Sequence, residues 1–105
     1  MKLLNKELEA KFKTVGSQED VKDPIIIAKY FHPYHSVNWY ATEYDPENKM
    51  FFGFVAGLMG DPSCDEWGSF TLDEIESINL KGLPVERDLH FGYPKASTVK
   101  AIKLY

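Results

Sequence analysis

The stretch VNWYATEYDPENKMFFGFVAGL, residues 37–58, decides the fold. Its first half alternates as an extended strand does, because successive side chains of a strand point to opposite faces. Val37, Trp39, Ala41 and Glu43 fall on one face, and Asn38, Tyr40, Thr42 and Tyr44 on the other. DPENK then supplies a turn, since Pro46 after Asp45 suits the first central position of a type I turn. The stretch therefore predicts an antiparallel hairpin, in which Gly53 and Gly57 mark a bulge or a close approach of backbones.

Further elements flank this hairpin on both sides. Residues 5–16 have helical apolar spacing, with Asn5 as N-cap and Gly16 just past the end. The run IIIAKYF, residues 25–31, predicts a strand that is covered on both faces, and EWGSF, residues 66–70, predicts a short fourth strand. Residues 71–78 carry a capping box, with Thr71 at the N-cap and Glu74 three residues later.

The predicted fold is a single α+β domain over residues 1–105. It has an antiparallel sheet of three to five strands around a central meander, with two to three short helices packed on it. The tail, residues 97–105, fits neither the helical nor the strand period cleanly. We expect a helix capped by Ser97 there, with an edge strand as the alternative.

Composition excludes several classes of protein. A formal charge of −4, from 12 basic and 16 acidic residues, opposes the basic footprint that duplex DNA binding requires. Cys64 is the only cysteine, so no intramolecular disulfide can form. Charged residues interrupt the first segment where a signal peptide needs an apolar run, and no stretch approaches the length of a membrane span. These features predict a cytoplasmic protein that does not enter a membrane.

The segment GLPVERDLHFGYP, residues 82–94, holds the candidate functional residues. If it is extended, Glu86, Asp88 and His90 share one face, while Val85, Arg87, Leu89 and Phe91 share the other. Two carboxylates and an imidazole could ligate a divalent metal or divide acid and base work. The interpretation we prefer is structural: the stem of Arg87 lies on the core, and its guanidinium pairs with a carboxylate such as Asp23 or Glu43.

Other motifs point only weakly to chemistry. His32 and His35 could join His90 in a zinc site, but Pro33 between them implies a turn, so we interpret them as exposed turn histidines. FFGFV, residues 51–55, partly matches the aromatic strand of RNA-recognition motifs, and aromatic core packing is the simpler interpretation. We predict no bound metal and no cofactor.

Six segments together resemble a known family: LLNKEL, SQEDVKDP, WYATEYD, FFGFV, WGSFTLDEIESI and GLPVERDLHF. The chain is similar over nearly its whole length to a small bacterial family, domain of unknown function 2958. The resemblance implies a cytoplasmic, single-domain protein of bacteria that is often encoded on mobile genetic elements. It implies no activity and no catalytic residue.

The function that we expect is non-enzymatic protein binding or regulation. The candidate surface consists of Glu86, Arg87, Asp88 and His90 together with Trp39 and Tyr40 on the adjacent hairpin, facing a protein partner. A small metal-dependent hydrolase or nuclease using Glu86, Asp88 and His90 is one alternative. A single-stranded nucleic-acid binder using exposed aromatic side chains is another. The sequence predicts neither the partner nor the oligomeric state.

Overall fold

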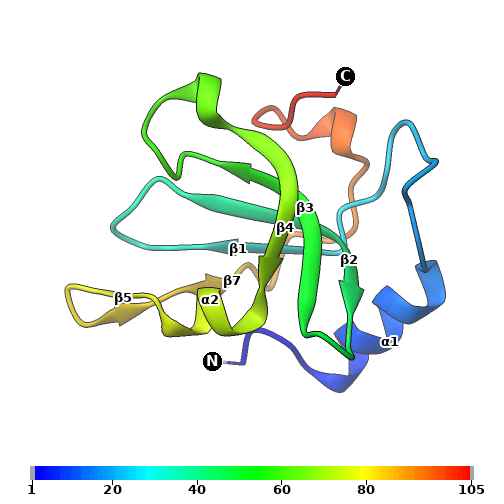
Figure 1. Ribbon diagram of the computed structural model, residues 1–105, viewed down its shortest axis with the longest axis horizontal. Helices are drawn as coiled ribbons and strands as arrows, with labels where there is room; N and C mark the ends of the chain where they lie inside the picture. Colours follow the sequence, from blue (N-terminus) through cyan, green and yellow to red (C-terminus); the bar gives the residue numbers. More distant parts are fainter. Residues whose placement is uncertain (1, 105) are drawn as a thin grey trace.

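The hairpin predicted from residues 37–58 forms the centre of the molecule (Figure 1). The structure is a computed structural model that describes residues 2–104. Strand β2, Asn38–Asp45, pairs antiparallel with β3, Met50–Ala56, and Tyr40 lies opposite Phe54. In the turn between them, the carboxylate of Asp45 accepts hydrogen bonds from the backbone N–H of Glu47 and the side chain of Asn48. The predicted hairpin and its turn are confirmed.

A five-stranded antiparallel sheet is built outward from this hairpin, in the order β4-β3-β2-β1-β7. The remaining strands, in chain order, are β1 (Ala28–Phe31), β4 (Glu66–Thr71), β5 (Asn79–Leu80), β6 (Leu83–Pro84) and β7 (Glu86–Arg87). Strands β5 and β6 form a separate two-stranded hairpin that projects from one end of the molecule (Figure 1). The predicted α+β class and the strand at residues 66–70 are confirmed.

Both helices begin at the caps that the sequence predicts. Helix α1, Lys6–Val15, starts where the side chain of Asn5 accepts a hydrogen bond from the N–H of Leu8, at 2.8 Å. Helix α2, Leu72–Ser77, starts where the Thr71 hydroxyl accepts from the N–H of Glu74, at 3.0 Å. These side chains satisfy backbone donors that the first helical turn leaves without a partner.

Two hydrophobic clusters cover the two faces of the sheet. The first includes Phe12 of α1, Ile75 of α2 and Phe51 of β3. The second includes Phe54 of β3 and Ile102 of the tail. The isoleucine run contributes to both, because Ile26 belongs to the second cluster and Ile27 to the first. The prediction that this run is covered on both faces is confirmed, although the regular strand begins only at Ala28.

A β-bulge at Thr42 changes which side chains of β2 share a face. The pairing shifts register between Ala41 and Glu43, so Tyr44 packs against Phe51, with ring centroids 4.7 Å apart, on the same side as Ala41. The strict alternation predicted for residues 37–44 is therefore wrong beyond Ala41, because one extra residue reverses the faces that follow it. The side-chain amide of Gln18 holds the bulge by donating to the carbonyl of Thr42, at 2.9 Å.

Gly53 sits at a close approach of two backbones, as the sequence predicts. A Cβ on this residue would collide with the carbonyl oxygen of Tyr40. Gly68, directly opposite in β4, differs, because a Cβ there would meet nothing within 4 Å. One glycine is thus required by packing, and the other borders open space.

The tail does not form the helix that we expected for residues 97–105. Only a single 3-10 turn forms, Ala96–Thr98, and no regular element follows it up to residue 104. Ser97 is not a cap, because its own N–H and hydroxyl donate to the carboxylate of Asp23, at 2.8 and 2.6 Å. The segment just before the tail pairs with residues 24–26, where the N–H of Ala96 donates to the carbonyl of Pro24 and the N–H of Ile26 donates to the carbonyl of Pro94.

Candidate functional site

A shallow depression of about 440 Å³ beside β1 and β7 gathers several of the predicted site residues. Arg87, Asp88 and His90 line it together with His32 and His35. Glu86 does not line it, although it is half-buried in β7 opposite Phe31. The structure therefore brings together three of the four predicted residues of the 86–90 segment.

Asp88 serves as a turn residue in this depression. One carboxylate oxygen accepts a hydrogen bond from the backbone N–H of His90, at 3.0 Å, which closes the turn that ends β7. The other oxygen lies 4.0 Å from the ammonium nitrogen of Lys29, which also stands above the ring of Phe91. Asp88 thereby holds the chain as it leaves the sheet.

The faces predicted for residues 85–91 hold only as far as Arg87. Val85 is buried in the first cluster, and Arg87 is half-buried opposite Tyr30, with its Nε atom inaccessible to solvent. Beyond Arg87 the chain turns, so Leu89 is 59% exposed and Phe91 packs with the second cluster, on the other side of the sheet. The prediction of one shared face is therefore wrong for Val85, Arg87, Leu89 and Phe91. Side chains alternate between two faces only where the backbone is extended, and it is not extended beyond Arg87.

Asp23 and Glu43 are the two carboxylates that we expected beside Arg87. Asp23 binds Ser97 at the tail, and Ser97 together with the nearby Lys95 holds the pKa of its carboxyl below the ordinary value. Glu43 is half-buried after the bulge and borders two hollows beside Phe52.

His32 is buried, which corrects the expectation of two exposed turn histidines. Its Nδ1 accepts a hydrogen bond from the N–H of Tyr34, at 3.0 Å, and its Nε2 lies 2.9 Å from the carbonyl oxygen of Leu83. This geometry fixes the neutral tautomer with the proton on Nε2. His32 thus ties the β1–β2 loop to the β5–β6 hairpin, whereas His35 is exposed as expected.

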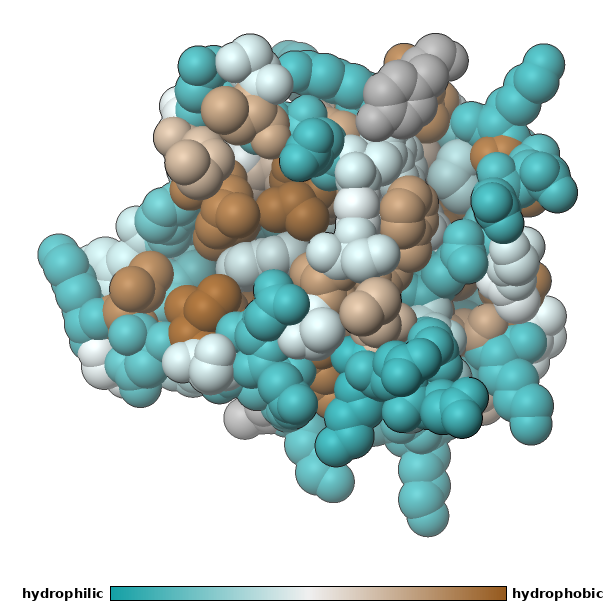
Figure 2. Space-filling view, in the orientation of Figure 1, coloured by the Kyte–Doolittle hydropathy of each residue, from teal (hydrophilic) through white to brown (hydrophobic). Residues whose placement is uncertain are grey.

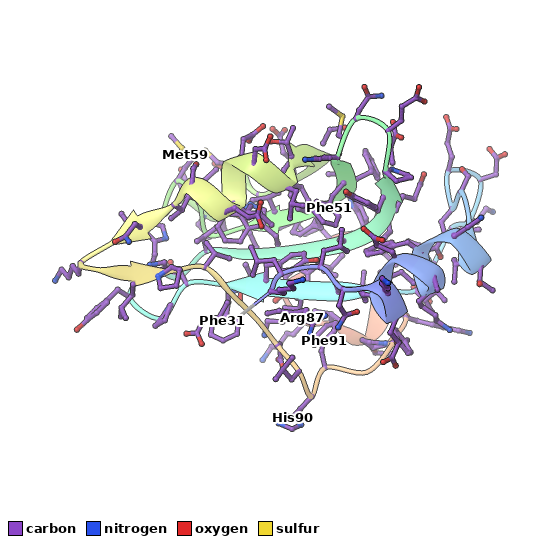
Figure 3. The ribbon with its side chains drawn as sticks, turned by 90° about the horizontal axis from the view of Figure 1, so that it is seen from below. Phe31, Phe51, Met59, Arg87, His90 and Phe91 are labelled. Carbon is purple, nitrogen blue, oxygen red and sulfur yellow. The ribbon has the colours of Figure 1, made fainter. Side chains whose placement is uncertain are left out.

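His90 projects from its turn away from the sheet, as the view from below shows (Figure 3). In the same view, Arg87 lies close beside β1. Within residues 2–104, no group of three or more His, Cys, Asp or Glu side chains is arranged to hold a metal ion.

Trp39 and Tyr40 do not contribute to a surface. Each is only 4% exposed; Trp39 lies in the first cluster and Tyr40 in the second. Burial also raises the pKa of the Tyr40 hydroxyl. The candidate surface is corrected here, because β2 is the central strand of the sheet and both of its faces are covered.

The opposite edge of the sheet carries a feature that the sequence analysis missed. Strand β4 pairs with β3 over all six residues without a bulge and is the terminal strand of the sheet. Among residues 2–104, no backbone hydrogen bond reaches the outer side of β4. Alternate residues of this six-residue strand thus direct backbone donors and acceptors to a side where no strand of the described chain pairs with them.

The sequence around β4 is strongly acidic. Residues 50–80 contain no Lys, Arg or His and six acids: Asp61, Asp65, Glu66, Asp73, Glu74 and Glu76. Removing these six from the 16 acids of the chain leaves ten, against 12 basic residues, so the remainder is slightly positive. Inspection of charge blocks would have found this segment from sequence alone. The N–H of Ser63 holds the pKa of Asp61 below its ordinary value, and Lys103 adds to this effect.

Exposed apolar side chains lie on the same face of the molecule. Leu58 and Met59 follow β3, and Leu80 and Leu83 belong to the β5–β6 hairpin; their exposures are 51%, 71%, 41% and 36%. Figure 2 shows brown side chains gathered around the turn after β3 and around β5. We call these four residues the apolar patch.

A pair of stacked aromatic rings, Phe52 and Trp67, borders β4 on the side of the C-terminal tail. The rings of Phe52 and Trp67 are nearly parallel, with centroids 6.1 Å apart, and Phe52 is 39% exposed. Trp67 is anchored by a hydrogen bond from its indole N–H to the carbonyl of Lys103, at 2.8 Å. The two rings line a groove of about 720 Å³, which Glu19, Lys22 and Glu43 also border.

Together, these features define a small α+β domain whose antiparallel sheet is open along one acidic edge. None of the helices in the described part of the chain is long and apolar enough to cross a membrane. The chain belongs to the family described as "Protein of unknown function (DUF2958)", whose model matches residues 2–101. Neither the curated proteins nor the solved structures include a significant match to it.

Proposed function

We propose that this protein is a non-enzymatic protein-binding module and that the apolar patch is its contact surface. The observation that carries the proposal is the exposure of Leu58, Met59, Leu80 and Leu83, which belong to the turn after β3 and to the β5–β6 hairpin, around which Figure 2 shows two groups of apolar side chains on one face. Exposed apolar groups that gather in one place mark surfaces that another molecule covers, because their burial on association is favourable.

The backbone around Leu58 and Met59 supports this proposal. Gly57 and Gly60 flank the pair, and both have positive φ, at 80° and 76°. Glycine adopts this conformation without strain, so the two residues set a turn that displays the apolar side chains between them. Methionine also adapts its shape to different partners, which suits a binding surface.

The residues once considered for acid–base chemistry support binding over catalysis. Asp88 closes its turn and faces Lys29, and His90 projects away from the sheet (Figure 3). An exposed free thiol at Cys64 is compatible with a reducing compartment and supports our proposal that the protein acts in the bacterial cytoplasm. The family resemblance supports an origin on a mobile genetic element.

Nucleic-acid binding is the weaker alternative. Phe52 is the observation in its favour, because an exposed aromatic ring on a strand can stack on a base. Glu19 and Glu43 outnumber Lys22 among the charged side chains that border the same groove, and the acidic segment 50–80 contains β4. These charges repel phosphates, so the geometry favours a polypeptide.

Peptide selection tests the proposed function. Random peptides displayed on phage are selected on the immobilised protein, and enriched peptides are then synthesised and titrated. We expect binders whose affinity falls at least about fivefold with Met59→Ser, since a contact of this size contributes on the order of 1 kcal/mol. Leu89→Ser is the matched control, because Leu89 is also exposed but lies on the 88–90 turn. Selection of no peptide, or binders equally sensitive to both substitutions, would contradict the proposal.

A further inference from the structure

We infer that β4 is a strand-addition site, where an extended, basic segment of a partner polypeptide joins the sheet at its open edge. The inference rests on the proposed function, because it names the chemistry and the binding mode of the partner. It concerns β4 itself, whereas the proposed function concerns the neighbouring apolar patch.

The backbone of β4 is arranged for such pairing. Its register with β3 is continuous from Glu66 to Thr71, so its outer side keeps the regular alternation of donors and acceptors. The strand contains no proline and no lysine, and it has no bulge, all of which proteins use to block exposed edges. Six residues span about 20 Å, so a partner segment of five or six residues would cover the edge.

Side chains of an added strand would find room on both faces. On one face, Gly68 leaves open space where any other residue would project a Cβ. On the other face, Ser69 is exposed next to the stacked rings of Phe52 and Trp67. Alternate residues of an added strand would therefore contact an apolar ring surface and an unfilled space beside the backbone.

Charge selects the occupant. Glu66 lies at one end of β4, and Asp73 and Glu74 begin the helix at its other end. Two lysines lie near the ends of the strand: the ammonium of Lys103 donates to the carbonyl of Pro62 and acts on Asp61, and the backbone carbonyl of Lys49 accepts from Leu72. Pairing of β4 with a second copy would bring two acidic segments together, which is unfavourable. A basic segment gains attraction to the same charges, so a foreign basic strand is the occupant that fits.

A set of synthetic peptides tests this inference. The parent probe is a capped seven-residue peptide that alternates Lys and Val, and its partner carries Glu in place of every Lys. Two further probes are N-methylated, one at each Val and the other at each Lys. Alternate N–H groups of a strand point to the same edge, so only one of these two probes removes the donors that would pair with β4.

Titration calorimetry and amide exchange supply the readouts. We expect the basic peptide to bind at least tenfold more tightly than the acidic one, with an affinity that falls as salt rises. One N-methylated probe should lose about tenfold or more, while the other should bind like the parent. Binding should slow amide exchange in residues 66–71.

Two protein variants sharpen the test. Glu66→Gln should weaken binding about two- to fivefold, as expected for one exposed charge pair. Glu7→Gln on α1 is the matched control, since Glu7 is exposed and far from β4 in sequence and fold. It should leave affinity unchanged. Equal urea midpoints would confirm that both variants are folded.

Each contrary outcome has a distinct meaning. Equal effects of the two N-methylated probes, or unchanged exchange in β4, would overturn strand addition. Preference for the acidic peptide, or a dimer paired through β4, would overturn the basic occupant. Peptides selected on phage that respond to Met59→Ser would then still support the proposed function, so the two failures are distinguishable.

Discussion

The two edge strands of the sheet, β7 and β4, differ in length and in how far their outer sides are open to further pairing. Strand β7 pairs with β1 over only two residues, after which the carboxylate of Asp88 turns the chain out of the sheet. Strand β4 pairs over six residues and keeps an unobstructed outer side within the described chain. A short edge strand that ends in a charged turn offers few backbone groups to an added strand, whereas a long regular edge strand offers a continuous row of them. The difference shows that the open edge is a property of β4 and not of the sheet as a whole.

The largest expected effect comes from the two opposed glycines, Gly53 and Gly68. Gly53→Ala should destabilise the protein by roughly 3 kcal/mol, because the added methyl would collide with the carbonyl of Tyr40. Gly68→Ala should be neutral or stabilising by about 0.5 kcal/mol, because it meets open space and restricts the unfolded chain. Urea unfolding of both variants measures the difference. A large loss with Gly68→Ala would show that the space beside Gly68 on that face of β4 is filled.

The β7 edge is tested by Arg87→Ala. We expect a loss of about 2 kcal/mol, because the side chain is half-buried beside β1 and its Nε is inaccessible to solvent. The matched control is His90→Ala, which should cost under about 0.5 kcal/mol, since His90 is exposed. Urea midpoints at equal slope give both values. If Arg87→Ala proves as harmless as His90→Ala, β7 does not anchor its edge.

Tyr30 lies opposite Arg87 and links the N-terminal segment to β1. Its buried hydroxyl donates to the carbonyl of Leu3, at 2.7 Å, and burial raises the pKa of that hydroxyl well above its ordinary value. Tyr30→Phe should cost about 1 kcal/mol, because it leaves a buried carbonyl without this donor. Thermal unfolding measures the loss, and faster amide exchange near residues 3–8 should accompany it. An unchanged melting temperature would mean that water replaces the hydroxyl freely.

The smallest effect concerns the tail strap that lies away from both edges. The hydroxyl and then the N–H of Ser97 lower the pKa of Asp23 below 3.8 in the folded state. A lowered folded-state pKa adds stability above the unfolded-state value, and that stability is lost as pH falls through the folded-state value. Urea midpoints should therefore drop in this acidic window, and Asp23→Asn should flatten the drop. Ser97→Ala should flatten it similarly; a profile unchanged by either substitution would contradict the strap.

Local signals in the sequence determined much of the fold. The side chains of Asn5 and Thr71 each accept a hydrogen bond from the backbone N–H three residues later and so cap the helices that the sequence predicts. Pro46 begins the turn that joins β2 to β3. These features depend on residues a few positions apart, so their physics is complete within the segment. The candidate site was only partly predictable for the same reason: Asp88 and His90 meet through a local turn, whereas His32 reaches them only in the folded chain.

The tertiary structure alone decided which surfaces are available. Trp39 and Tyr40 have alternation that would suit a half-exposed strand, but α1 and α2 cover one face of β2 and the tail covers the other. The bulge at Thr42 depends on Gln18, which lies 24 residues away, and so no local period reveals it. Equally, β4 is open because no later segment pairs with it within residues 2–104. The sequence by itself determined the strands and their caps, and tertiary packing decided which strand kept a free edge, because burial depends on distant neighbours.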